Sequence, residues 1–300
     1  MSGHSHHHGH TGVAHRWRLQ AALALTGAFF VVEVAAGLWS GSLTVLSDAG
    51  HMAADTVGLV VALAASHWAT RPDTTGRRTY GRYRAEIFAA GVSVLLMIAV
   101  CGYVLINAVL RLGSPMEVPA GVLMVVGVIG LAVNLVALAL LRGGSSENLN
   151  VKGAYLEVLA DALGSVGVLI AGFATWLTGW WLWDPILALC LAGFVSVRAV
   201  RLGREVIGVL GEAAPSGIDP ATTRNRLAAV DGVVEVHDLH LWTLTSGMNV
   251  ATAHLVSIEG TDPAAVLVAA SAVLRDEFGI DHATLQVEPA GSDACQGTAW

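Results

Sequence analysis

Long apolar stretches alternate with short polar segments over the first 210 residues of the chain. A helix needs about 20 mostly apolar residues to cross the hydrocarbon core of a bilayer. Five stretches reach this length. The sixth, whose uncharged run covers 185–197, reaches it only with the tryptophan-rich residues before it and a few residues after it. The pattern predicts six transmembrane helices, at about 19–38, 42–66, 87–110, 118–141, 153–178 and 180–203.

The pattern changes after residue 211, where the apolar runs become shorter and their spacing varies. Alternation of apolar and polar residues indicates strands, and Ser246-Gly247 is a turn signal between two of them. Thr261 or Asp262 is a candidate N-cap for a second helix. The predicted order is helix, strand, strand, helix, strand, at 219–230, 233–244, 248–258, 262–278 and 283–288. This order is typical of a small α+β domain.

Composition supports this division into a membrane part and a water-facing part. The chain is 54% hydrophobic and 13% charged, against roughly 25% charged residues in soluble domains. This excludes a disordered chain and disfavours a wholly soluble one. Residues 212–300 are acidic, with 12 Asp/Glu and 3 Lys/Arg. We expect a His-rich tail at 1–15, a transmembrane domain at 16–211, a cytoplasmic domain at 212–290 and a C-terminal tail at 291–300.

Basic residues next to the predicted helices indicate the orientation, because Lys and Arg are enriched on the cytoplasmic side. Twelve of them, including Arg198 at the end of the sixth helix, fall on the side that holds both termini. The opposite side receives only Arg111. The sequence therefore predicts an integral, multi-pass membrane protein with both termini in the cytoplasm. The His-rich start is either a native segment that binds metal loosely or an expression tag.

Ionisable residues inside transmembrane helices are costly and usually mark a function. His51 and Asp55 are spaced i, i+4 in the second helix, and Glu157 and Asp161 have the same spacing in the fifth. That spacing puts each pair on one helix face. Two such faces would present one imidazole and three carboxylates, which suits a tetrahedral divalent ion, above all zinc. The alternative is that these acids form separate interhelical hydrogen bonds. No Lys or Arg lies inside the apolar stretches to pair with them, except at the end of the sixth helix.

Protons would compete with the metal for this site. Three facing carboxylates repel one another when the ion is absent, so entry of the metal expels protons and entry of protons expels the metal. The GxxxxGK[ST] loop of ATP-driven pumps does not occur in the sequence, and no nucleotide is implied. The residues therefore favour a secondary transporter that exchanges a metal ion for protons.

Several segments resemble the cation diffusion facilitator family, in particular its zinc-transporting branch. The segments are SLTVLSDAGHMAADTVGL, TYGRYRAEIFAA, AYLEVLADALGSVGVL and VDGVVEVHDLHLWTLTSG, and the likeness extends over about residues 16–290. The resemblance implies a homodimeric, proton-coupled antiporter that exports zinc or a related ion from the cytoplasm, as in a bacterial cell membrane. It also implies a ferredoxin-like, metallochaperone-like cytoplasmic domain. Neither an organic cofactor nor a nucleic-acid partner is expected.

The chain departs from the family at Glu157, where zinc-transporting members generally have His. Glu adds a negative charge and replaces a nitrogen ligand with a harder oxygen. Export of cadmium, cobalt, iron or manganese therefore stays open beside zinc. Glu33 and Asp48 lie near these ligands in the predicted bundle. Either could relay protons or serve as a structural hydrogen-bond partner.

The resemblance also matches His237, His254 and Glu288 to positions that bind a regulatory metal in some members. The alternative is that these are ordinary solvated side chains. His237 and His240 are three residues apart on one predicted strand, so we expect them on opposite faces.

Two other functions are alternatives to transport. A membrane metal sensor would need a signalling domain, and the sequence contains no kinase, nuclease or DNA-binding signature. A membrane metalloenzyme would need an open coordination position and a general base, whereas all the candidate groups here look used as ligands. We therefore expect a transporter and not an enzyme.

Overall fold

The computed structural model describes residues 16–69, 76–113, 118–142 and 149–290. The predicted tails at 1–15 and 291–300 lie outside the described residues. The chain divides into two compact units, one of residues 1–59 and 92–200 and the other of residues 60–91 and 201–300. Each unit is described by itself.

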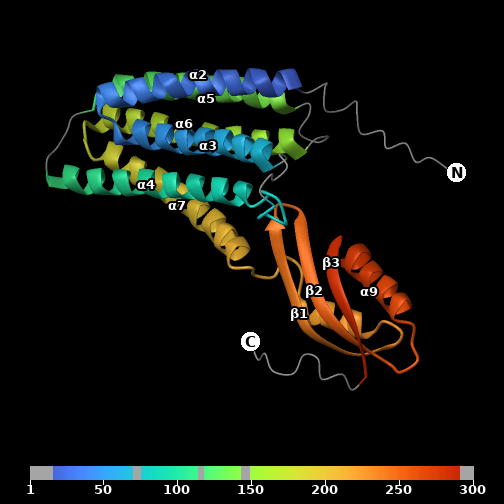
Figure 1. Ribbon diagram of the computed structural model, residues 1–300. Coiled ribbons are helices and arrows are strands. Elements are labelled where there is room, and N and C mark those ends of the chain that lie inside the picture. Colours follow the sequence, from blue (N-terminus) through green and yellow to red (C-terminus); the bar gives the residue numbers. More distant parts are fainter. Residues whose placement is uncertain (1–15, 70–75, 114–117, 143–148, 291–300) are drawn as a thin grey trace. The chain divides into compact units, whose positions relative to one another are not determined.

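Six long helices account for the apolar part of the chain (Figure 1). Each corresponds to one of the six predicted stretches; three of them begin one to three residues later than predicted, and the others begin earlier. Their bounds are α2 Arg16–Ser40, α3 Leu43–Ala69, α4 Ala85–Gly113, α5 Ala120–Arg142, α6 Leu149–Thr178 and α7 Trp183–Leu210.

Five of these helices are long and apolar enough to cross a membrane, judged on the described residues. They are α2, α4, α5, α6 and α7. The helix that is not among them, α3, carries Asp48, His51 and Asp55. The structure therefore confirms a helical membrane domain with several spans. The count of six spans stays a prediction.

Glycine allows the membrane helices to approach closely. In Figure 1, α2 lies along α5 and α5 lies along α6. A Cβ atom on Gly127 of α5 would stand 2.7 Å from Leu169 of α6. A Cβ atom on Gly164 of α6 would stand 2.2 Å from Asp48 Oδ1 of α3. Glycine at position 164 therefore lets the Asp48 carboxylate rest directly against the backbone of α6.

Asp184 ties the start of α3 to the first turn of α7. Its carboxylate accepts hydrogen bonds from Ser42 Oγ at 2.5 Å and from the backbone N–H groups of Leu43 at 2.8 Å and Thr44 at 3.1 Å. Arg111 of α4 pairs with the same carboxylate at 3.1 Å. The first backbone N–H groups of a helix have no partner within it. Asp184 satisfies them from another helix, and its negative charge suits the positive end of the α3 dipole.

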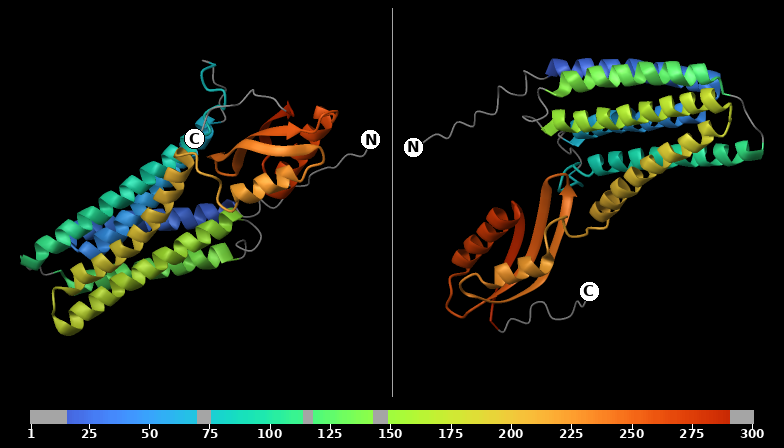
Figure 2. Two further views of the ribbon diagram at one scale, coloured as in Figure 1. Left: turned by 90° about the horizontal axis from the view of Figure 1, so that it is seen from below. Right: turned by 180° about the vertical axis from the view of Figure 1, so that it is seen from behind.

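The C-terminal part folds as a three-stranded sheet with two helices (Figures 1 and 2). The strand order is β1-β2-β3; β1 pairs antiparallel with β2, and β2 pairs parallel with β3. The predicted order of elements is confirmed, with small shifts at the ends. The ferredoxin-like assignment stays a prediction. The bounds are α8 Pro220–Ala228, β1 Val233–Thr245, β2 Met248–Ser257, α9 Pro263–Phe278 and β3 His282–Pro289.

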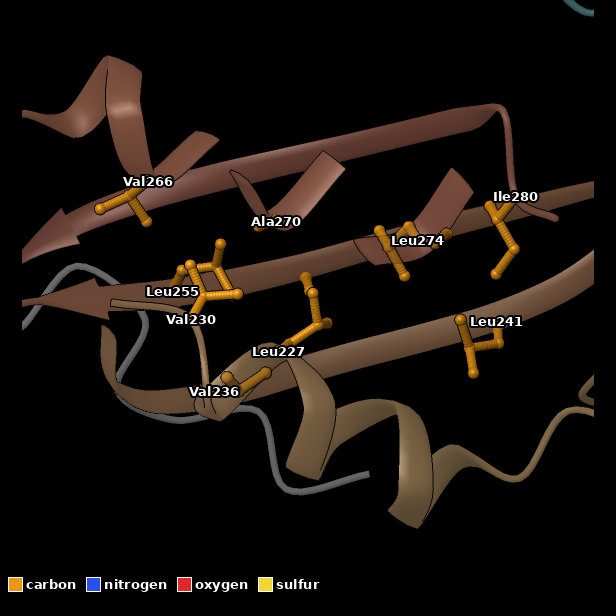
Figure 3. Packing of buried hydrophobic residues seen from close by; sticks show 11 residues of the cluster. Leu227, Val230, Val236, Leu241, Leu255, Val266, Ala270, Leu274 and Ile280 are labelled. Carbon is orange, nitrogen blue, oxygen red and sulfur yellow. The ribbon is translucent and has the colours of Figure 1, made fainter. Parts of the chain in front are cut away.

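The core of this domain lies between the sheet and the two helices (Figure 3). Leu227 of α8, Leu255 of β2 and Leu274 of α9 are all completely buried there. Asp262 is the N-cap of α9, as one of the two predicted candidates, because its side chain accepts from Ala264 N at 3.0 Å. Gly279 ends the helix in the left-handed conformation that favours glycine.

Candidate metal-transport site

The predicted pairs on α3 and α6 come together inside the helical unit. His51 lies between two carboxylates: its Nδ1 is 3.4 Å from Asp55 Oδ2, and its Nε2 is 3.9 Å from Asp161 Oδ1. His51 and Asp161 are buried, and Asp55 is half-buried. Helical i, i+4 spacing explains the pairing on each helix. Packing of α3 near α6 then brings an imidazole and carboxylates from two helices to one place.

Glu157 joins this group from the next turn of α6. Its carboxyl group lies within hydrogen-bonding distance of Asp55. It is also paired with Arg198, at 2.8 Å between Arg198 Nη2 and Glu157 Oε1. All four predicted ligands therefore belong to one cluster. One imidazole and three carboxylates form a donor set that a divalent transition metal accepts.

Arg198 of α7 was missed as a member of this site. It follows the apolar run of the sixth predicted helix and was expected only as one of the basic residues at the end of that helix, not as part of the ligand cluster. Its guanidinium lies 3.2 Å from His51 Nε2 and 3.4 Å from Asp55 Oδ2. One feature of the sequence could have indicated that Arg198 belongs to the site: it directly follows the uncharged run 185–197. A long Arg side chain can reach from there toward the carboxylates.

Glu33 and Asp48 form a second acidic pair beside the site. Glu33 of α2 is completely buried and Asp48 of α3 is nearly so, and the two carboxyl groups interact with each other. A cavity of about 200 Å³ is lined by Ser47, Asp48 and His51 together with residues of α6 and α7. The cavity connects Asp48 with the candidate ligand His51. This position agrees with either of the roles that the sequence left open.

Three predicted residues also meet on the sheet of the cytoplasmic domain. Glu288 Oε1 is 3.0 Å from His254 Nδ1, and Glu288 Oε2 is 3.6 Å from His237 Nε2. One ligand atom from each of the three residues fits within a mutual distance of 4.8 Å. The strands explain this, because His237 is the register partner of His254 and β3 runs alongside β2. Two imidazoles and a carboxylate fit a zinc ion.

The expectation that His237 and His240 lie on opposite faces of the strand was wrong. The pairing of β1 with β2 shifts by one residue between them, so that His237 pairs with His254 and His240 with Thr252. Such a bulge restores both side chains to the same face. Asp238, at the bulge, has a positive φ of 50°. Its carboxylate lies 2.9 Å from His240 Nε2 and 3.9 Å from His254 Nε2.

Two family models match the chain. The model for the cation efflux transmembrane domain matches residues 19–210, and the model for the cytoplasmic domain of cation efflux proteins matches residues 215–290. The chain belongs to the cation diffusion facilitator family. The resemblance inferred from the motifs is therefore confirmed, as is the expectation of a membrane-bound metal cation efflux protein that is not an enzyme.

Named relatives of this facilitator support the same assignment. The metal cation efflux system protein CzcD of Cupriavidus metallidurans is 43% identical over 95% of this chain and 90% of that protein. The zinc transporter ZitB of Escherichia coli is 38% identical over 90% of this chain and 87% of that protein. A cadmium, cobalt and zinc/H(+)-K(+) antiporter of Bacillus velezensis is 34% identical over 95% and 92%. Divalent metal efflux is therefore the general activity of this group.

Proposed function

We propose that the protein is a proton-coupled antiporter that exports divalent transition metals, and zinc first among them, from the cytoplasm. The observation that carries the proposal is the position of the His51 imidazole between Asp55 and Asp161, with Glu157 on the adjoining turn. His51, Asp55, Glu157 and Asp161 would bind the ion as substrate. One nitrogen donor and three oxygen donors make up the four ligands that a zinc ion commonly binds.

Proton coupling follows from the same cluster. The Arg198 guanidinium offsets only one of the three carboxyl groups in this partly buried site. The other two cannot both stay charged unless a metal ion is bound. Protons and metal ions therefore exclude each other from the same oxygens, and the group takes up and loses protons as a unit. The Bacillus velezensis relative, described as a cadmium, cobalt and zinc/H(+)-K(+) antiporter, supports coupling of this kind.

The proposed protein crosses the membrane six times, with α3 as the sixth span beside the five apolar helices. Its three polar residues face the site and not the lipid, so a lower hydropathy is expected of this helix. Both termini then lie in the cytoplasm, in agreement with the twelve basic residues on that side.

The transporter works as a homodimer held in part by the cytoplasmic domains. A zinc ion on His237, His254 and Glu288 would stabilise that arrangement, and Glu33 and Asp48 would serve the proton path.

A wider range of ions is the second candidate, and Glu157 favours it. A carboxylate in place of an imidazole makes the donor set harder, which moves the preference toward manganese and iron. Two relatives whose names give cadmium, cobalt and zinc as the ions of an antiporter point to breadth as well.

Flux into proteoliposomes tests both candidates. We expect zinc to enter vesicles when the vesicle interior is more acidic than the outside, and uptake to fall when the gradient is collapsed. Cadmium, cobalt, manganese and iron are then added one at a time as competitors. Zinc binding without any flux would instead support a membrane metal sensor. Flux that ignores the pH gradient would contradict antiport.

A further inference from the structure

The guanidinium of Arg198 contacts three of the four proposed ligands of the transported ion. Nη1 lies 3.2 Å from His51 Nε2 and 3.4 Å from Asp55 Oδ2, and Nη2 lies 2.8 Å from Glu157 Oε1. A guanidinium has five N–H donors, no acceptor and a permanent charge. Each of these contacts therefore uses an acceptor atom that a metal ion would need.

At His51, Arg198 and a bound metal ion would compete for the same lone pair, that of Nε2. Because Arg198 can only donate, His51 Nε2 must accept, and the ring proton then sits on Nδ1, which faces Asp55 Oδ2 at 3.4 Å. Nε2 is also the nitrogen that faces Asp161 Oδ1, at 3.9 Å. An ion held between His51 and Asp161 needs the Nε2 lone pair. The ion and the guanidinium cannot use it together.

The spacing of the ligands agrees with this exclusion. In the described part of the chain, only His237, His254 and Glu288 form a group of three whose ligand atoms all lie within 4.8 Å of one another. The ligand atoms of the four transport-site residues do not form such a group of three, and the Arg198 guanidinium lies among them. The positive charge balances one of the three carboxylates, so the site without metal carries less excess charge.

We propose that Arg198 is a tethered cation that competes with the transported ion for His51 and Asp55. It holds the ligands when no ion is bound and must leave them when the ion enters. Its return then helps to expel the ion. Arg198 in this way sets the affinity of the site and speeds release. The inference rests on the proposed function of the four ligands and adds to it a competitor that belongs to the protein.

Zinc binding and zinc flux of the full-length protein test this role when measured together. In Arg198→Gln the competitor is absent, and we expect zinc to bind roughly tenfold or more tightly, since hydrogen bonds to charged groups contribute that much. Maximal flux should fall, because protons alone must then displace the more tightly bound ion at release. Arg198→Lys keeps the charge but loses the planar fork, and should lie in between. Arg201→Gln, at an exposed arginine three residues further along α7, is the matched control and should leave both quantities unchanged.

A merely structural role for Arg198 predicts a different result. Arg198→Gln would then lose zinc affinity and flux together, and that result, or an unchanged affinity, overturns the inference. Should Arg198→Gln fail to fold, modification of arginine by phenylglyoxal in the wild-type protein gives an independent answer. Zinc should speed modification of Arg198 relative to Arg201. An equal or slower rate with zinc overturns the inference.

Asp161→Asn separates this inference from the proposed function on which it rests. If Asp161→Asn binds and transports zinc like the wild type, the four-residue site itself is wrong. If Asp161→Asn loses zinc while Arg198→Gln gains no affinity, the site stands and only the role of Arg198 fails.

Discussion

Glu157 stands where the family resemblance leads us to expect His in a zinc transporter. It touches Arg198 at 2.8 Å and lies within hydrogen-bonding distance of Asp55. It could therefore bind the ion directly or hold Arg198 in place. Its carboxylate brings the number of negative charges in the site to three, and Arg198 brings a positive charge that offsets one of them.

Replacing Glu157 tests its part in ion choice. We expect Glu157→His to raise zinc flux relative to manganese flux, because imidazole is the softer ligand. Glu157→Gln keeps the shape and loses the charge, and should weaken the transport of every ion. Zinc and manganese flux of both variants are compared with the wild type across a range of pH. If both variants keep the ion ranking and pH dependence of the wild type, Glu157 is not a ligand.

At the scale of elements, the junction of α3, α4 and α7 is the clearest device for holding the bundle. Asp184 of α7 is 2% exposed and receives the N-terminal N–H groups of α3 together with Arg111 of α4. The proposed ligands His51 and Asp55 lie on α3, so this cap also fixes the start of the helix that carries them.

Removing the charge of Asp184 should destabilise the protein. Asp184→Asn leaves Arg111 without its ionic partner in a mostly buried position, and breaking such a pair costs about 3–5 kcal/mol. Thermal unfolding of the protein in detergent should show a lower midpoint than for the wild type. Asp276→Asn, at an exposed carboxylate whose partner Arg275 is exposed as well, should leave the midpoint unchanged. Equal midpoints for Asp184→Asn and Asp276→Asn would show that the cap does not hold the bundle.

The elements themselves were largely predictable, since the length of apolar runs predicts helices and alternation predicts strands. The i, i+4 spacing also predicted that the four proposed ligands would lie in pairs, because helical geometry fixes which residues share a face. Three features were not predicted. Arg198 enters the site through a tertiary contact, Asp184 caps a helix more than 130 residues away in the sequence, and the bulge at Asp238 inserts one residue into the alternation. Each depends on packing between segments, which a pattern within one segment does not contain.

For the whole molecule, metal and assembly should be linked through the cytoplasmic domain. Residues 212–300 carry 12 acidic and 3 basic residues, so two copies repel each other at low salt. A zinc ion on His237, His254 and Glu288 would lower that repulsion. We expect zinc to increase crosslinking between two copies of the full-length protein in detergent, and a chelator to reverse it. His254→Ala should abolish the response to zinc, while Glu259→Gln, at an exposed carboxylate outside the cluster, should keep it. Crosslinking that does not respond to zinc in the wild type would contradict the link.

The central claim is that α3 and α6 carry one ion-binding site for export, and Asp161 tests it most directly. Asp161 is buried, faces His51 Nε2 and comes from the opposite helix. Zinc flux into proteoliposomes under a pH gradient is measured for the wild type, Asp161→Asn and Glu205→Gln, an exposed carboxylate on α7. We predict flux at the background level for Asp161→Asn and at the wild-type level for Glu205→Gln, with both proteins folded. Zinc flux at the wild-type rate in Asp161→Asn would contradict the claim.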